Sequence, residues 1–273
     1  MDAVELTREL IKIESTDPGS WETEIGEYIC DYLKESGADI LCLQEYQTIE
    51  SPRYLSQKDV EKALKDYPYH NIQIVGRGSG KGHTNRIACY SKFPILSSRT
   101  LDYASEYNGS VVYELKMGED TVMLINNHLE SNKLTKEDKV VYESMLKSPE
   151  TEKVKSGARL LIRKLAEASA IRAPQADSIA QEIAASRYPY IIVCGDFNDT
   201  PISYAHRVIE KGLNDAFTKS GRGLGISYNQ NKFYFRIDNI LASKNLKPYN
   251  CTVDRSIKES DHYPIWCYLK KKD

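Results

Sequence analysis

The sequence has 273 residues, of which 41% are hydrophobic, and this fits one large α/β structure with a sizeable core. Its net charge of −2 argues against tight, non-specific binding of nucleic acid by the chain as a whole, because such binding neutralises many phosphates with Lys and Arg. The sequence contains neither a long apolar run nor a signal-peptide pattern at its start. We therefore expect a cytoplasmic monomer without a membrane span.

Six cysteines are present, and none of them belongs to a Cys-x-x-Cys pair. Cys42, Cys89, Cys194 and Cys267 each lie in an apolar, strand-like run. We interpret them as small buried side chains of a reduced protein, because their spacing does not fit a structural zinc site.

In the first half of the chain, apolar residues recur at helical spacing over 21–36, and a second helical pattern covers 57–66. Strand patterns cover 39–43, 70–75, 86–91, 97–102, 110–116 and 121–127, and a hairpin turn at 117–120 joins the last two. The glycine-rich stretch 76–84 is interpreted as a flexible loop. A phosphate cradle is the weaker alternative, because Gly82 stands where Ser or Thr is required.

In the second half, 136–187 has a helical pattern that Pro174 should break or kink. Its basic residues favour a solvated face, with contact to a polyanionic substrate as the alternative: Lys153, Lys155, Arg159, Arg163 and Lys164. Strands at 190–194, 234–241 and 263–268 and a helix at 202–211 follow. Because hairpins occur among these elements, we expect packed sheets flanked by helices, not a doubly wound parallel sheet.

Polar groups follow apolar runs at five places along the chain. They are Gln44-Glu45, Asn126-Asn127-His128, Asp196-Phe197-Asn198-Asp199, Asp238-Asn239 and Asp261-His262. Each one alone has an ordinary explanation as a solvated acid, a hydrogen-bonded histidine or a turn residue, and Asp199 is most simply a helix cap. Strand ends of a layered fold, however, aim side chains into one shared cleft. Together these oxygen-rich groups predict a Mg²⁺ or Mn²⁺ site, and the neighbouring histidines favour attack of water on a phosphoester.

Six stretches then carry a specific resemblance. In chain order they are Ala38–Glu45, Tyr90–Ile95, Asn126–Leu129, Gly195–Asn198, Arg236–Asp238 and Ser260–His262. With them, residues 38–273 resemble the endonuclease/exonuclease/phosphatase superfamily, which includes pancreatic deoxyribonuclease, abasic-site endonucleases and inositol-polyphosphate 5-phosphatases. The resemblance implies an α/β four-layer sandwich, in which two mixed β-sheets lie face to face and are flanked by helices.

The resemblance also implies a role for each matching residue. Glu45 and Asp261 would bind the metal, Asp196 would orient or deprotonate the attacking water, and Asn198 would hold the phosphate or that water. Phosphoryl transfer depends mostly on such positioning and on charge stabilisation.

The histidines take the remaining implied roles. His262, oriented by Asp238, would contact the scissile phosphate or transfer a proton. His128 would donate to a phosphate oxygen or help the leaving group, with Asn126 nearby to bind substrate.

The start of the chain departs from this pattern. The family opens with a strand that carries an active-site Asn, whereas 11–16 has none, and Ser15 or Thr16 would be weaker replacements. The stretch 5–19 instead resembles the start of di-zinc aminoacylase/carboxypeptidase-type metallopeptidases, without their catalytic residues. We therefore treat 1–37 as an atypical, helical and possibly fused segment, and 38–273 as the catalytic domain. Whether 5–13 is a helix or 10–15 a strand stays open.

Two functions follow from the sequence. The first is divalent-metal-dependent hydrolysis of a phosphoester, by a nuclease, phosphodiesterase or phosphatase, acting on nucleic acid or a small phosphorylated molecule. Its activity is expected to be weakened, but not abolished, by the altered first strand. The alternative is a catalytically impaired scaffold that binds a phosphorylated ligand in the same cleft.

Overall fold

The computed structural model of the chain describes residues 21–51, 54–76, 85–147, 152–230, 233–257 and 260–272. They form two compact units. The first comprises the described residues up to 39 together with 47–67, and the second comprises 40–46 and the described residues from 68 onward. The stretches 5–19 and 77–84, and with them the question of the first strand, lie outside the described residues.

The first unit contains two helices, α2 (Trp21–Glu35) and α3 (Gln57–Ala63). A capping box starts α3, because the Ser56 hydroxyl accepts from the Asp59 N–H while the Asp59 carboxylate accepts from the Ser56 N–H. The Tyr67 hydroxyl donates to the Ala38 carbonyl oxygen at 2.8 Å and so joins the end of this unit to the turn after α2.

The second unit is built on a six-stranded mixed sheet with the order β4-β5-β6-β7-β11-β8. Its strands are β4 (Ile95–Thr100), β5 (Gly109–Met117), β6 (Asp120–His128), β7 (Tyr190–Asp196), β8 (Leu213–Asp215) and β11 (Asp238–Ser243). The pair β6–β7 is parallel, and the other neighbours are antiparallel.

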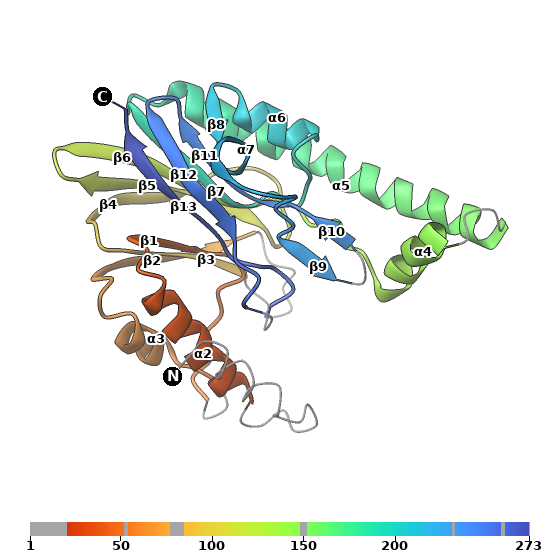
Figure 1. Cartoon of the computed structure of the whole chain (residues 1–273), viewed down its shortest axis with the longest axis horizontal. Helices are drawn as coiled ribbons and strands as arrows, with labels where there is room; N and C mark the ends of the chain where they lie inside the picture. Colours follow the sequence, from red (N-terminus) through yellow and green to blue (C-terminus); the bar gives the residue numbers. More distant parts are fainter. Residues whose placement is uncertain are drawn as a thin grey trace. The chain divides into compact units, whose positions relative to one another are not determined.

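Two smaller antiparallel sheets lie against one face of this sheet (Figure 1). One has the order β1-β3-β2, and the other pairs β12 with β13. Their strands are β1 (Ile40–Leu43), β2 (Tyr69–Val75), β3 (Asn85–Ser91), β12 (Leu246–Val253) and β13 (Ile265–Lys271). The shared core includes Ile87 and Cys89 of β3, Tyr113 of β5, Ile240 of β11 and Cys251 of β12.

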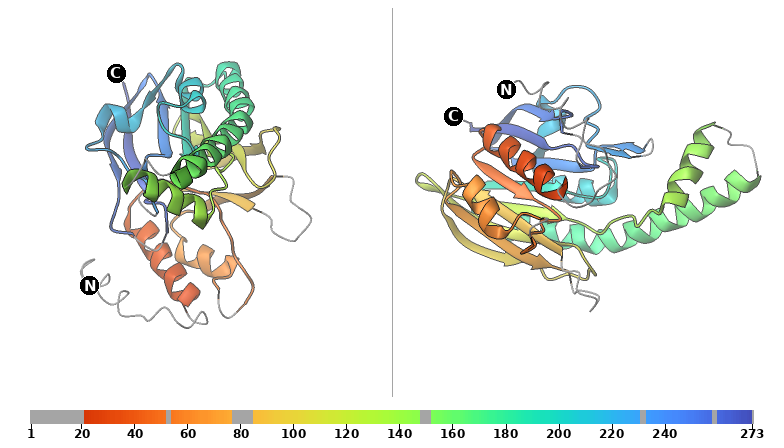
Figure 2. Two further views of the ribbon diagram at one scale, coloured as in Figure 1. Left: turned by 90° about the vertical axis from the view of Figure 1, so that its right-hand side faces the viewer. Right: turned by 90° about the horizontal axis from the view of Figure 1, so that it is seen from below.

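Helices cover the other face of the six-stranded sheet. Ala176 and Ile179 of α5 (Glu152–Ala185) and Ile209 of α6 (Tyr204–Glu210) pack on Ile125 and Val193 of β6 and β7. The same helices can be followed from two further directions in Figure 2. The remaining elements are α4 (Lys136–Lys147), α7 (Ala216–Ser220), β9 (Tyr228–Gln230) and β10 (Phe233–Phe235).

The predicted α/β fold with face-to-face sheets and flanking helices is confirmed. Among the described residues, the layer opposite the large sheet is two antiparallel sheets instead of one mixed sheet. All six cysteines are free, as the reduced interpretation requires. No helix in the described part of the chain is long and apolar enough to cross a membrane.

Two element predictions need correction. Pro174 does not break the helical run, because α5 continues through it from Glu152 to Ala185, while the alternative of a kink stays a prediction. The predicted strand 234–241 is divided into β10 and β11, because the N–H groups of Ile237 and Asp238 both donate to the Ser227 hydroxyl between the two strands.

A buried ion pair joins β8 to the segment before β11. The Arg236 guanidinium donates to both oxygens of Asp215, at 3.0 and 2.6 Å, and Asp215 is 1% exposed. Burial by itself would raise the pKa of Asp215, but His206 and Arg236 favour the anion and hold this pKa well below its usual range. The pair is therefore a pH-dependent contribution to stability.

A close backbone approach fixes the pairing of β6 with β7. Gly195 has φ +117°, and a Cβ atom placed on it would lie 2.1 Å from the Asn127 carbonyl oxygen. Only glycine fits this position without displacing the backbone of β6.

Replacing Asp215 by Asn should lower the free energy of unfolding by about 3–5 kcal/mol at pH 7, because Arg236 is left buried and unpaired. A depressed pKa gives stability that is complete above the unfolded value, about 4, and is lost at lower pH. Urea unfolding should therefore show the wild-type advantage constant from pH 7 to 5 and shrinking below about 4. Glu182→Gln, on an exposed pair with Arg99, serves as the control. An advantage that persists unchanged below about pH 4 would contradict this account.

Replacing Gly195 by Ala should destabilise the protein by more than the roughly 1–2 kcal/mol of a left-handed residue alone, because the Cβ meets backbone atoms of Asn127. Gly118→Ala is the matched control, since Gly118 also has positive φ but a Cβ there meets nothing within 4 Å. Equal losses of unfolding free energy in the two variants would show that the close approach does not matter.

Candidate active site

The centre of the site is a row of side chains across three neighbouring strands. His128 ends β6, Asp196 ends β7, and Asp238 begins β11. In the strand register His128 lies opposite Asp196, and Asp196 lies opposite Asp238. The parallel pair and its antiparallel neighbour thus bring three polar ends to one edge of the sheet.

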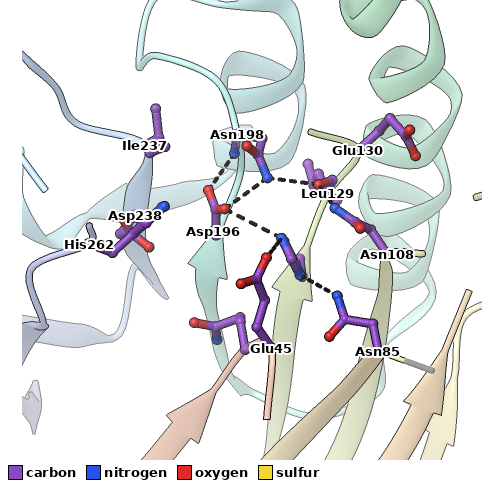
Figure 3. A network of polar contacts seen from close by, with 12 residues as sticks. Glu45, Asn85, Asn108, Leu129, Glu130, Asp196, Asn198, Ile237, Asp238 and His262 are labelled. Atoms are coloured by element: carbon purple, nitrogen blue, oxygen red, sulfur yellow. Dashed lines mark hydrogen bonds and ion pairs between the residues drawn. The ribbon is translucent and has the colours of Figure 1, made fainter. Parts of the chain in front are cut away.

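Residues of the β1-β3-β2 sheet complete one side of the row (Figure 3). His128 Nε2 lies 3.7 Å from Glu45 Oε1 and 3.6 Å from Asp196 Oδ2. Asn85 Nδ2, at the start of β3, lies 3.4 Å from His128 Nδ1. Glu45 directly follows β1 with φ +52°, and its side chain is 76% exposed, so the carboxylate is open to solvent.

On the other side of the row, Asp238 holds His262. Asp238 Oδ2 lies 2.8 Å from His262 Nδ1, and the Tyr228 ring stands edge-on to the imidazole at a centroid distance of 5.1 Å. Burial would lower the pKa of His262, but the hydrogen bond and charge of Asp238, then the charges of Asp196 and Asp261, raise it to about 9. In the metal-free protein this imidazole is therefore a cation at neutral pH.

The two other buried groups of the row shift toward their neutral forms. Burial and then the charge of His262 lower the pKa of His128 to about 4, so its imidazole is neutral. Burial and then the charge of Asp238 raise the pKa of Asp196. The Asp196 carboxylate is therefore crowded by the neighbouring Asp238.

Asn198 is bound tightly to Asp196. It has φ +51°, its backbone N–H donates to Asp196 Oδ1 at 2.7 Å, and its Nδ2 donates to Asp196 Oδ2 at 2.8 Å and to the Leu129 carbonyl oxygen at 3.0 Å. Both hydrogens of the side-chain amide are therefore used in orienting Asp196 and the loop after β6. This geometry adds an orienting function to the phosphate or water contact predicted for Asn198.

Two predicted site residues lie apart from this row. Asn126 is buried, donates to the Ala88 carbonyl oxygen at 3.2 Å and accepts from Gln44 Nε2, so it links β6 to the opposing sheet. Asp261 is exposed and acts on the row through its charge on His262. Substrate binding by Asn126 and metal binding by Asp261 stay predictions.

A candidate metal site lies within the row itself, in addition to the predicted ligands Glu45 and Asp261. Ligand atoms of Asp196, Asp238 and His262 all lie within 4.8 Å of one another. Glu45 borders the same row, because its carboxylate and that of Asp196 both lie within 3.7 Å of His128 Nε2. Because Asp196 and Asp238 are buried side by side, their two carboxylates fit a divalent cation, which would offset the burial and the mutual repulsion that raise the pKa of Asp196, while His262 keeps its contact with Asp238.

Sequence reasoning missed the supports behind the row, above all Arg172 and Gln175 of α5. Both are buried, and they continue the apolar helical stripe that includes Ala168 and Ile179. An Arg and a Gln on the apolar face of a helix indicate buried polar groups that must have hydrogen-bonding partners. Asn85 left no comparable signal, because it borders the glycine-rich stretch that was interpreted as a loop.

Comparisons with solved structures show the same fold at low identity. An endonuclease/exonuclease/phosphatase from Bacteroides vulgatus is 20% identical with a TM-score of 0.57, covering 90% of this chain and 90% of its own. A TDP2 of D. rerio, humanized by 14 mutations, is 16% identical with a TM-score of 0.61, covering 90% and 93%. A beta toxin of Staphylococcus aureus is 16% identical with a TM-score of 0.61, covering 93% and 94%. No curated protein sequence matches the chain.

The sequence profile of one family covers most of the chain. It matches residues 26–262 and is described as the endonuclease/exonuclease/phosphatase family. The match begins inside the segment 1–37 and gives no support to the metallopeptidase resemblance of that segment, while a domain boundary at 37/38 stays a prediction. On the strength of this match, together with the shared fold, the chain belongs to the endonuclease/exonuclease/phosphatase family.

Proposed function

We propose that the protein is a divalent-metal-dependent phosphoester hydrolase in which water attacks phosphorus next to Asp196. The observation that carries this proposal is the row in which Asp196 stands between His128 and the Asp238–His262 pair. Family membership supports phosphoester hydrolysis in general. The metal requirement and the roles of individual residues are the new content of the proposal.

Mg²⁺ or Mn²⁺ would be held by Asp196 and Asp238, with Glu45 as the further carboxylate in reach of the same row. The predicted ligand Asp261 would add charge from the exposed side. When bound, such a cation stabilises negative charge on phosphoryl oxygens and lowers the pKa of water. Asp196, in its anionic form, would orient the attacking water or accept its proton.

The two histidines differ in charge, and we assign them different roles. His262, held by Asp238 and cationic in the metal-free protein, would stabilise negative charge on the scissile phosphate. His128 is neutral, and an amide hydrogen of Asn85 directed at Nδ1 leaves the ring hydrogen on Nε2. The Nε2–H group of His128 would then donate to a phosphate oxygen or to the leaving group, and the neutral ring adds no second positive charge to the site.

The substrate is a phosphoester of nucleic acid or of a small molecule. The net charge of −2 gives no preference for duplex DNA. A panel of DNA, RNA, nucleotides, sphingomyelin and inositol phosphates, assayed with Mg²⁺ and Mn²⁺, identifies the class. If the wild-type protein turns over none of these compounds but binds them, the alternative of a phospho-ligand scaffold is correct.

Replacing Asp196 by Asn should lower kcat by about 10²- to 10³-fold, or about 3–4 kcal/mol, as for other single groups that act on the transition state. The variant removes the carboxylate charge at nearly unchanged side-chain volume, but it keeps only one of the two hydrogen bonds that Asp196 accepts from Asn198, because Asn has a single acceptor oxygen. Steady-state kinetics on the best substrate of the panel measure the effect. Glu119→Gln, in the exposed turn between β5 and β6, should retain full activity. Wild-type kcat in D196N would contradict the assignment.

Removing divalent cations with EDTA should abolish turnover, and Mg²⁺ or Mn²⁺ should restore it. Binding is followed separately by thermal unfolding, because a cation at about 100 times its Kd stabilises the folded state by about 2.7 kcal/mol. The stabilisation by Mn²⁺ should be reduced in Asp238→Asn and in Glu45→Gln and unchanged in Glu119→Gln. Stabilisation of wild-type size in both site variants would place the cation elsewhere.

A further inference from the structure

Arg172 is a charged side chain buried far from solvent, although no step of the proposed chemistry uses it. It comes from α5 and is 2% exposed. A buried guanidinium is retained only where hydrogen-bond acceptors surround it, so the direction of its contacts shows what it holds in place.

One set of contacts reaches the loop after β6. Arg172 Nη1 donates to the Glu130 carbonyl oxygen and to Asn132 Oδ1, both at 2.9 Å. One helical turn further on, Gln175 Oε1 accepts from the Glu130 N–H at 3.0 Å. The residues that directly follow His128 are thereby attached to the helix.

A second set reaches the loop after β7. Arg172 Nε donates to Asp199 Oδ2 at 3.1 Å. Asn132, itself held by Arg172, donates from Nδ2 to the Asn198 carbonyl oxygen at 3.1 Å. The Asn198 carbonyl oxygen and the Asp199 side chain are thus held by Arg172 or by a group that Arg172 contacts.

The two loops leave the sheet directly behind the reacting side chains. His128 and Asp196 are register partners at the ends of the parallel strands β6 and β7, and a backbone hydrogen bond from the Leu129 N–H to the Asp196 carbonyl oxygen, at 3.0 Å, extends this pairing by one step. The planar fork of a guanidinium spans both loops at once and holds them in one geometry. Lysine, a single point donor, cannot satisfy these acceptors together.

We propose that Arg172 is a positioning residue that sets the Asp196–Asn198 unit against His128 by clamping the two loops. The expected effect of Arg172 on catalysis rests on the proposed function, whereas its effect on the position of the two loops does not depend on activity. The clamp predicts that the environment of the Asn198 side-chain amide changes when Arg172 is replaced, because this amide donates to Asp196 and to the Leu129 carbonyl oxygen.

The test compares Arg172→Lys with Asn132→Ala, which removes the link to the Asn198 carbonyl oxygen at smaller risk to folding. Ser169→Ala is the matched control, because Arg172 Nη2 donates to Ser169 Oγ at 3.2 Å but this bond reaches neither loop. Thermal unfolding first establishes that each variant is folded.

In both site variants kcat should fall about 10- to 100-fold, with KM changed less than about threefold. A loss of this size is expected when a residue that supports a reacting side chain is removed and that side chain is slightly misplaced. The double variant should lose less than the product of the two single effects, because both act through one clamp. S169A should keep the wild-type kcat. A folded R172K and N132A with wild-type kcat, in the presence of an active wild-type enzyme, would overturn the proposal.

A second readout does not depend on turnover. In ¹⁵N-labelled protein, the Asn198 side-chain amide signals, assigned by their loss in Asn198→Asp, should shift in R172K and N132A and stay in place in S169A. Unchanged signals in both site variants would overturn the proposal even if the wild-type protein proved inactive on every substrate. Failure of the proposed function is recognised separately, by absent wild-type turnover together with shifted signals.

Discussion

The site depends on the register of one parallel strand pair. Because β6 and β7 run in the same direction with His128 opposite Asp196, their polar ends meet at one edge of the sheet, and antiparallel β11 adds Asp238 to the same row. Gly195 allows this pairing by bringing its backbone against Asn127. A slip of one residue would turn each of these side chains to the opposite face of the sheet.

The same row creates an electrostatic imbalance that the protein does not resolve by itself. Asp196 and Asp238 are buried as neighbours, and His262, which is cationic in the metal-free protein, is held by Asp238. The raised pKa of Asp196 and the lowered pKa of His128 both follow from this crowding and burial. A divalent cation would relieve the repulsion between the two carboxylates, and the same positive charge would favour attack of water on a phosphoester. One bound cation would therefore both stabilise the site and support its chemistry.

Much of this arrangement could be predicted from sequence, because it depends on short-range patterns. Apolar runs that end in Asp196 and His128 identified strand ends, and the Gly-Asp-Phe-Asn and Ser-Asp-His stretches identified the family. What failed depended on distant contacts. Pro174 stays within α5, where the packing of Ala176 and Ile179 on the sheet holds the helix beyond it. Arg172 was not identified as a site residue, because its partners in the two loops lie 27 to 42 residues away along the chain.

The central claim is that one divalent cation is held between the ends of β7 and β11. Anomalous diffraction from a crystal soaked in Mn²⁺ tests it most directly. The account predicts a peak within about 2–2.6 Å of carboxylate oxygens of Asp196 and Asp238. A well-occupied peak bound by other residues, or no peak beside these carboxylates at saturating Mn²⁺, would contradict it.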